Sequence, residues 1–499
     1  MRLGKASTTR WLSLGLMVAL TGIMSAAHAG ALGAPYQPGG IPDGASSSNL
    51  HAVTGAGGES VLLASSYINR YAPAGSALWP AAQALSGVQW ADVGTDRFGN
   101  YVVAEEMVGQ GGIYATVHDR NGAVITPRFR IDQGTMTDFS QPYVSMNSDG
   151  VFTVSWTVQT PSNSFTRRYR VFNRNGSARG PEFVAQGGDS VTQLGSSIDA
   201  DGRFSHLSLH VTPDFWHMRL AATRFDSNGN VVAPLSYITS PPNTVNYAVM
   251  AGNQSGDQVI AWMNYARDTN TQGIAFQRYS SSGQLLGGNV LVDASATEPF
   301  LPAVGVAEDG SFVVTWAART AASNPSAPWG LYGRQYAKDG TALGAAFRID
   351  DAPVANPYYL SHTVAMNHAG EFTVMWQQYN GSQTSLWARN YVLDNQPAAQ
   401  ALTSGVAING LSGAAGTLQY LKFTVPVGTS NFNVTMSGAG DADMLIKHGA
   451  QPTPARYDIS PAIDGSNEGA LVNNPPAGTF YIGLYGYTSY SNVSVRVDY

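Results

Sequence analysis

Two adjacent carboxylates, Glu105 and Glu106, are the residues of this sequence whose type best fits catalysis, because paired carboxylates carry glycoside hydrolysis. They follow the turn glycine Gly99 at a position where related stretches of the chain have a Trp. A strand end that faces solvent or a central channel is the alternative interpretation. Glu105 and Glu106 are therefore candidate catalytic residues without a recognisable motif around them.

Local signatures of hydrolytic enzymes are otherwise missing from the sequence. There is no His-Glu-x-x-His zinc motif and no Gly-x-Ser-x-Gly nucleophile elbow. His206 and His210 are four residues apart in a strand-like stretch, and two strand side chains explain them better than a metal site. A catalytic triad built from distant residues stays open, since a triad is defined by its geometry.

Aromatic loops and acidic turns supply the candidate binding residues. Trp216 and Trp329 lie in variable loops, and exposed aromatic residues suit a glycan or protein partner. Aromatic side chains that fold back onto the domain are the alternative. Asp441 and Asp443 are candidate calcium ligands, the one cofactor that the sequence suggests, or simply an acidic turn before a strand.

A repeat of about fifty residues must position most of these side chains. Each unit contains a strand, a Gly turn, an apolar alternating strand, a variable loop, a third strand, a second turn and a fourth strand. Four units have a Trp six residues after the first-turn glycine, namely Trp156, Trp262, Trp316 and Trp376. The other three have Ala64, Glu105 and Ser208 there. We interpret the Trp residues as space-filling and the exceptions as places where function can enter.

Seven units of this repeat occur between residues 47 and 404. Four strands in about fifty residues form one blade of a β-propeller. A row of small β-sandwiches is the alternative, but a fifty-residue unit buries too little surface to fold alone. The sequence therefore predicts an all-β fold that begins with a seven-unit β-propeller of four-stranded repeats.

Residues 405–499 leave the repeat and predict a small β-sandwich. Several motifs in this segment resemble, in order, those of the bacterial pre-peptidase C-terminal domain: Gly440-Asp-Ala-Asp-Met-Leu-Ile-Lys-His-Gly449, Tyr457-Asp458, Ser466-Asn-Glu468 and Pro476-Ala-Gly-Thr-Phe-Tyr-Ile-Gly-Leu484. The resemblance implies a jelly-roll-like sandwich appended to secreted enzymes, often proteases, and sometimes removed after export.

The resemblance has two limits. Many members carry two cysteines where this chain has Ile459 and the Gly469-Ala470 pair, so their disulfide is missing here. Some relatives bind calcium or a polymer, but the resemblance gives no ligand set for this chain. The repeats are similar to those of uncharacterised exported bacterial proteins, a likeness that supplies no activity.

Residues 1–29 have the pattern of a cleavable signal peptide. Arg2, Lys5 and Arg10 precede a short apolar stretch, and Ala27-His28-Ala29 is a small-x-small cleavage site. Residues 30–46, rich in Gly, Pro and Ser, predict a flexible lead-in. No later stretch is long and apolar enough to span a bilayer. A secreted or periplasmic location is expected.

Charge and cysteine content narrow the function. The chain has no cysteine, and beyond residue 29 it has 24 basic and 33 acidic residues, which disfavours nucleic-acid binding. We therefore expect an extracellular polymer, glycan or protein as partner. The sequence favours an exported, non-catalytic binding or accessory protein that presents propeller loops. The alternative is a secreted hydrolase, a peptidase or glycosidase, with its site at the propeller's central channel.

Overall fold

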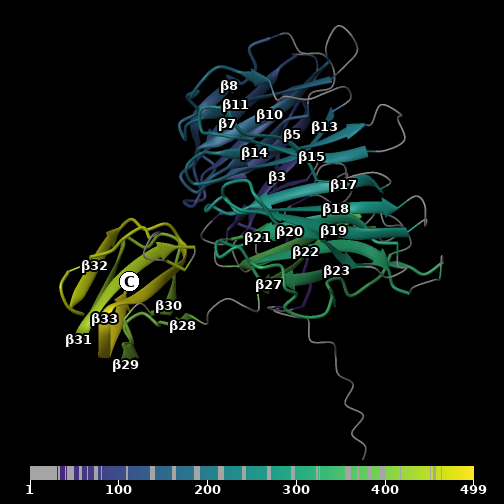
Figure 1. The fold of residues 1–499 in the computed structure, drawn as a ribbon. Helices are drawn as coiled ribbons and strands as arrows, with labels where there is room; N and C mark the ends of the chain where they lie inside the picture. The colour runs from purple at the N-terminus through teal and green to yellow at the C-terminus, as the bar shows by residue number, and fades with distance from the viewer. Residues whose placement is uncertain are drawn as a thin grey trace, which may run out of the picture.

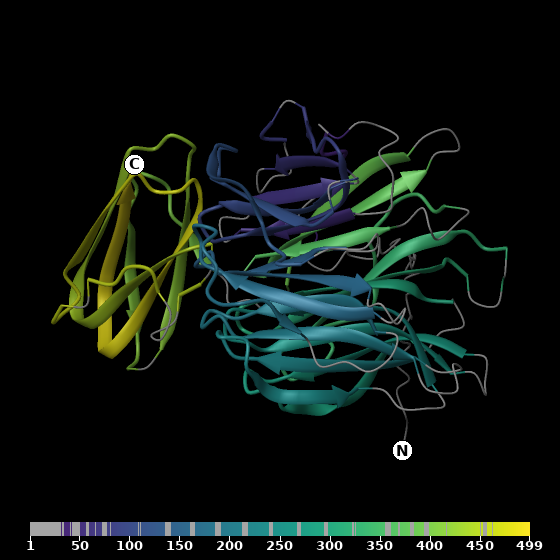
Figure 2. The ribbon, with the colours of Figure 1, turned by 90° about the horizontal axis from the view of Figure 1, so that it is seen from above.

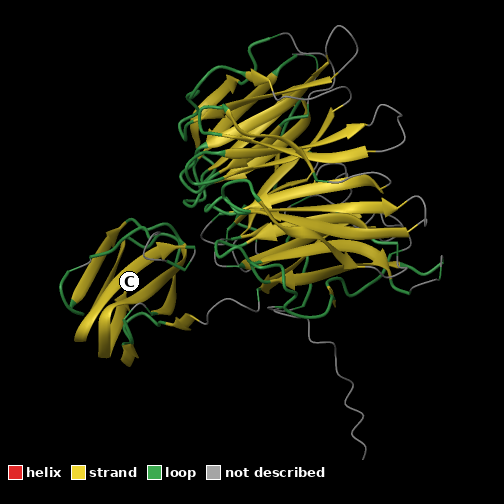
Figure 3. Ribbon diagram, viewed as in Figure 1, coloured by secondary structure: helices red, strands yellow, loops and turns green. Residues whose placement is uncertain are grey.

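The computed structural model describes residues 31–499 apart from 32–33, 40, 42–49, 56–58, 65, 72–76, 80, 108, 110, 135–140, 160–164, 185–190, 212–217, 239–242, 267–270, 294–297, 322–323, 325, 355–360, 368–369, 380–383, 394–398, 416, 450, 453–456 and 462. The expected signal peptide and Trp216 lie outside this set. Every regular element in the described residues is a strand (Figure 3). The described residues contain no helix that is long and apolar enough to cross a membrane.

Seven antiparallel sheets follow one another along residues 50–392 (Figure 1). The first strands are β1 (Leu50–Thr54), β5 (Val88–Thr95), β9 (Tyr143–Met146), β13 (Val191–Ile198), β17 (Asn243–Gly252), β21 (Phe300–Val306) and β25 (His362–Met366). The second strands are β2 (Ser60–Ala64), β6 (Tyr101–Met107), β10 (Phe152–Gln159), β14 (Phe204–Val211), β18 (Gln258–Ala266), β22 (Phe312–Arg319) and β26 (Glu371–Tyr379). The third strands are β3 (Tyr67–Tyr71), β7 (Ile113–His118), β11 (Phe165–Phe172), β15 (Met218–Phe225), β19 (Thr271–Tyr279), β23 (Trp329–Tyr336) and β27 (Thr384–Val392). The fourth strands are β4 (Gln83–Ala84), β8 (Val124–Arg130), β12 (Phe183–Val184), β16 (Val231–Tyr237), β20 (Leu285–Asp293) and β24 (Phe347–Arg348).

The sheets are the blades of a closed ring. The first strand of each blade packs against the first strand of the next, from β1 through β5, β9, β13, β17 and β21 to β25, and β25 packs against β1. The predicted all-β propeller is therefore confirmed, and the first strands surround its central axis.

Residues at the start of the described chain complete the last blade. Ala31 pairs with Tyr391 and Tyr36 with Ala388, both on β27. The Tyr36 N–H donates to the Ala388 carbonyl at 2.9 Å, and the Ala388 N–H donates to the Tyr36 carbonyl at 2.8 Å. Part of the segment expected to be a flexible lead-in is thus held, because the open edge of β27 offers unpaired backbone groups.

The repeated Trp side chains fill the space between blades, as the repeat indicates. Trp156, Trp262, Trp316 and Trp376 are all at most 2% exposed. Trp316 on β22, for example, packs with Ile274 and Phe276 of β19 in the preceding blade. These residues are part of the core.

A six-stranded sheet forms the C-terminal domain, with strands β28 (Ala399–Ala401), β29 (Ile408–Gly413), β30 (Leu418–Val425), β31 (Asn431–His448), β32 (Glu468–Asn473) and β33 (Gly478–Asp498). Their order is β28-β30-β33-β31-β32, and β29 also pairs with β33. The long strands β31 and β33 change register near Gly440 and enclose one apolar core, as in a β-sandwich. β28 already belongs to this sheet, so it starts before residue 405.

The C-terminal domain lies beside the propeller (Figure 2) and contacts it at a turn between a first and a second strand and at the start of the second strand β26. Arg97, between β5 and β6, donates to Asp458 Oδ1 at 2.8 Å, and its carbonyl accepts from His448 Nδ1 at 2.9 Å. The Tyr481 hydroxyl donates to Glu371 Oε1 at 3.3 Å. These contacts place the domain at one end of the propeller axis.

Candidate binding site in the propeller channel

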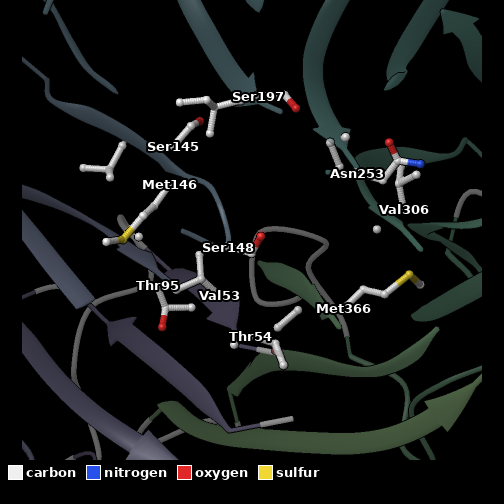
Figure 4. Close-up of a pocket in the computed structure, with 18 of the residues that line it drawn as sticks. Val53, Thr54, Thr95, Ser145, Met146, Ser148, Ser197, Asn253, Val306 and Met366 are labelled. Atoms are coloured by element: carbon white, nitrogen blue, oxygen red, sulfur yellow. The ribbon is translucent and has the colours of Figure 1, made fainter. Parts of the chain in front are cut away.

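Two cavities lie along the propeller axis and share several lining residues, so they form one channel. The smaller, about 240 Å³, is lined mainly by short side chains, among them Thr54, Thr95, Ser148 and Ser197 (Figure 4). Arg97, which contacts the C-terminal domain, also lines it. The smaller cavity therefore faces the C-terminal domain.

The larger cavity, about 390 Å³, is lined by the opposite halves of the first strands. It gathers aromatic and hydrogen-bonding side chains: Trp90, Tyr143, Gln141, His51, Asp92 and His362. Its volume lies within the range of small-molecule sites. The larger cavity is therefore the candidate functional site.

His51 and Asp92 form the polar centre of this cavity. The Nδ1 atom of His51 hydrogen-bonds Asp92 Oδ1, and Asp92 Oδ2 accepts the Val144 N–H at 2.7 Å. Burial lowers the pKa of His51, but the charge and hydrogen bond of Asp92 outweigh it, so the net shift is upward. Asp92 thus holds the ring by Nδ1, and the His51 side chain, 36% exposed, has Nε2 for a bound molecule.

The seventh blade adds two further groups. His362 Nε2 lies 3.0 Å from Thr315 Oγ1, so a neighbouring blade orients its ring. The Ala52 N–H donates to Thr363 Oγ1 at 3.4 Å, from the seventh blade to the first. These side chains are fixed by contacts between blades, which gives the cavity a preformed wall.

Glu105 and Glu106 lie away from the channel. Both are on β6, a second strand, and neither is among the residues that line the two cavities. Glu105 lies 3.9 Å from Arg128 Nε; burial raises its pKa and Arg128 opposes this. Glu106 is 6% exposed. The structure does not bring this pair into the candidate site.

Trp329 is buried and packs within its blade. It begins β23, is 6% exposed, and exchanges two backbone hydrogen bonds with Val354. The Arg319 guanidinium lies 4.7 Å from its ring centroid. The expected exposed aromatic loop residue is therefore a core residue, because Trp329 is the first residue of a strand and its backbone pairs with Val354.

Asp441 and Asp443 lie on β31, near the register change at Gly440. Asp441 Oδ1 accepts the Gly465 N–H at 3.0 Å, and burial followed by the charge of Asp441 raises the pKa of Asp443. In the part of the chain that the structure describes, no three His, Asp or Glu side chains are grouped to hold a metal ion. Calcium binding here stays a prediction.

Sequence reasoning missed His51, Asp92 and Tyr143 as site residues, although a signal was present. Each stands seven residues before a first-turn glycine, the same position of the repeat in three successive units. All three line the larger cavity. Variation at this position of the repeat, rather than at the Trp position, marks the channel.

Residues 417–486 match the family model of the bacterial pre-peptidase C-terminal domain. The chain carries a bacterial pre-peptidase C-terminal domain. This domain accounts for the similarity to alkaline serine exoprotease A of Vibrio alginolyticus, 37% identical over 98 residues, which are 20% of this chain and 18% of that protein. It also accounts for the similarity to the virulence metalloprotease of Vibrio anguillarum, 34% identical over 102 residues, 20% of this chain and 17% of that protein.

The chain spans less than a fifth of the length of these curated relatives. Among solved structures, α-L-arabinanase from Penicillium chrysogenum complexed with arabinobiose covers 62% of this chain and 94% of its own, with 10% identity and a TM-score of 0.40. A likeness this low supports no conclusion about activity. The family match thus concerns the C-terminal domain.

Proposed function

We propose that the protein is an exported, non-catalytic binding protein that takes a glycan at the larger cavity, with the pre-peptidase C-terminal domain as an accessory module. The observation that carries the proposal is the composition of that cavity. Trp90 and Tyr143 offer flat apolar surface, and Gln141, His51 and His362 offer hydrogen-bonding groups beside it. This combination suits a sugar ring, which has apolar faces and a polar rim.

Export is supported by the signal-peptide pattern of residues 1–29 and by the pre-peptidase C-terminal domain. Binding without turnover is supported by the small number of carboxylates in the larger cavity. Among the described residues that line the larger cavity, Asp92 is the single carboxylate. Most glycosidases use a pair of carboxylates that flank the bond to be broken.

A hydrolase is the second candidate, and the His51–Asp92 hydrogen bond is the observation in its favour. A histidine held at Nδ1 by a carboxylate is the arrangement of a general base in acyl-transfer enzymes. In this case His51 Nε2 would accept a proton from water or from a hydroxyl nucleophile at the cavity.

The test is incubation of the purified mature protein with casein and with a panel of glycans, with cleavage and retention both measured. We expect retention of a glycan without cleavage, and at least a tenfold loss of affinity in Trp90→Ala. Tyr487→Ala, a change at a 69% exposed residue of the C-terminal domain, serves as control. Turnover that His51→Gln abolishes would establish the hydrolase instead.

A further inference from the structure

Beside an apolar cluster, the space between the third and fourth blades contains buried polar side chains where four other blades have a Trp. Ser208, on β14, stands at the Trp position and is 3% exposed. His206 and His210 share its face of the strand, since alternate residues of a strand point the same way. Phe204, on that face, packs against Tyr169 of β11 at 5.1 Å between ring centroids. This face of β14 therefore looks toward the third blade.

Arg167 enters the same space from the opposite side. It lies on β11 two residues before Tyr169, and it is 4% exposed. Its Nε and Nη1 atoms have no hydrogen-bond partner in the described part of the chain. Burial lowers the pKa of Arg167 to about 9, and Tyr143 is the group that opposes this shift. The guanidinium is a buried cation without a carboxylate partner among the described residues.

His206 adds a second buried group without a partner. It is 4% exposed, and its Nε2 atom makes no hydrogen bond to any described residue. Burial, then the charge of Arg167, then His210 lower its pKa to about 3. Ser208 Oγ lies 2.8 Å from His210 Nε2, and the buried Thr223 stands opposite His206 on β15. The whole cluster can donate hydrogen bonds, and none of these five side chains is acidic.

Such a cluster destabilises the folded protein when no ligand satisfies its buried polar atoms. A buried charge without a partner destabilises the folded protein, and buried polar atoms without partners commonly mark the place of an ion or a water molecule. A guanidinium presents its N–H groups in a fork that matches the two oxygens of a carboxylate or phosphate. An oxyanion would satisfy Arg167 and accept from His206 together.

The cluster borders the larger cavity. The Arg167 guanidinium lies 6.0 Å from the ring centroid of Tyr143, which lines that cavity. Ser196 on β13 also lines this cavity, and its Oγ atom hydrogen-bonds Ser145 Oγ on β9 at 2.7 Å. This bond joins the two blades at the channel wall. Tyr143 therefore separates the cluster from the channel.

We propose that the space between the third and fourth blades binds a small oxyanion, a carboxylate or a phosphate, through Arg167 and His206, with entry from the larger cavity past Tyr143. The oxyanion is either a free ion or the acidic group of a sugar. The proposal does not depend on glycan binding, since a free ion meets the same side chains.

The test is thermal unfolding of the purified mature protein in the sodium salts of phosphate, sulfate, glucuronate and chloride at matched ionic strength. A further sample contains glucose in sodium chloride of the same ionic strength. We expect a saturable rise of several degrees in the propeller midpoint with at least one oxyanion and none with chloride. A response to phosphate and sulfate indicates a free ion, and a response to glucuronate alone indicates an acidic sugar. A rise with glucose as large as with glucuronate contradicts the oxyanion site while it supports glycan binding.

Arg167→Met is the decisive variant, because it removes the cation and leaves an apolar side chain of similar length. We expect the oxyanion response to disappear. Arg168→Met is the matched control on the opposite face of β11, where Arg168 pairs with Glu182, and it should keep the response. If Arg167→Met does not fold, His206→Gln should weaken oxyanion affinity at least tenfold. The proposal is overturned if the unmodified protein shows no oxyanion-specific rise. It is also overturned if the rise persists unchanged in Arg167→Met or, where that variant does not fold, in His206→Gln.

Discussion

His51 on the first blade and Asp92 on the second are joined by a hydrogen bond between His51 Nδ1 and Asp92 Oδ1. In Asp92→Asn the burial of the ring persists without the carboxylate, so we expect the pKa of His51 to fall from above its ordinary value to below it. An NMR titration of the imidazole, assigned with His51→Gln, measures this. Asp201→Asn, a change at an exposed turn, should leave the titration unchanged.

The sign of the stability effect follows from the raised pKa of His51. The pair stabilises the native state most below the ordinary histidine pKa of about 6.5, and this contribution is lost as the pH rises through the folded value. Asp92→Asn should therefore cost more stability at pH 5.5 than at pH 8.5 in urea unfolding. An equal loss at both pH values would show that the pair is not a protonated His with a carboxylate.

Trp316→Ala should destabilise the propeller strongly. The side chain is 2% exposed and contacts the preceding blade, so its loss leaves a cavity between blades. We expect a decrease of about 3–5 kcal/mol in the free energy of unfolding. Urea unfolding followed by circular dichroism measures it. Tyr487→Ala should stay within about 0.5 kcal/mol, and a loss that small for Trp316→Ala would mean that the blades repack freely.

Tyr36→Pro tests the closure of the ring. Proline removes the N–H that donates to the Ala388 carbonyl and disturbs the pairing with β27. We expect a loss of about 1–3 kcal/mol and faster hydrogen exchange along β27. Tyr36→Phe removes only the hydroxyl bond to Asn390 and should cost less, about 0.5–1.5 kcal/mol. Unchanged exchange in Tyr36→Pro would show that this segment does not hold the last blade.

His448 makes the domain contact sensitive to acid. It is 4% exposed, and burial lowers its pKa to about 4, against the hydrogen bonds to the Arg97 and Ala477 carbonyls. Between about pH 6.5 and pH 4 the unfolded chain binds more protons, so stability falls as the pH falls. His448→Gln should flatten this decline for the C-terminal domain, as thermal scans from pH 7 to pH 4 measure. An unchanged slope would place the acid sensitivity elsewhere.

The architecture could be predicted because it repeats. Turn glycines and alternating apolar residues determine the strand positions through local geometry. The Trp that recurs at the position of Trp316 indicates how neighbouring units pack. The pre-peptidase C-terminal motifs gave the second domain for the same reason, since they are short and contiguous. Both signals lie within one stretch of chain.

The candidate site could not be predicted, because its contacts cross from one blade to the next. His51 and Asp92 are 41 residues apart, and nothing near either residue indicates the other. Glu105 and Glu106 looked catalytic from their type alone, but a second strand keeps them away from the channel. Ser208 is visible in the sequence as an exception to the repeat, but the buried Arg167 that lies near it comes from the neighbouring blade, and the repeat does not indicate that residue.

The pairing of Tyr36 with β27 has a consequence for how the molecule is made. Tyr36 and Asn390, joined by a hydrogen bond, are 354 residues apart in sequence. We expect a contact of this separation to form late, because closing so long a loop costs conformational entropy before the contact can stabilise the chain. During synthesis, Ala31 and Tyr36 therefore lack their partners on β27 until the last blade has been made. We therefore expect the last blade to close on residues that are made before any of the blades.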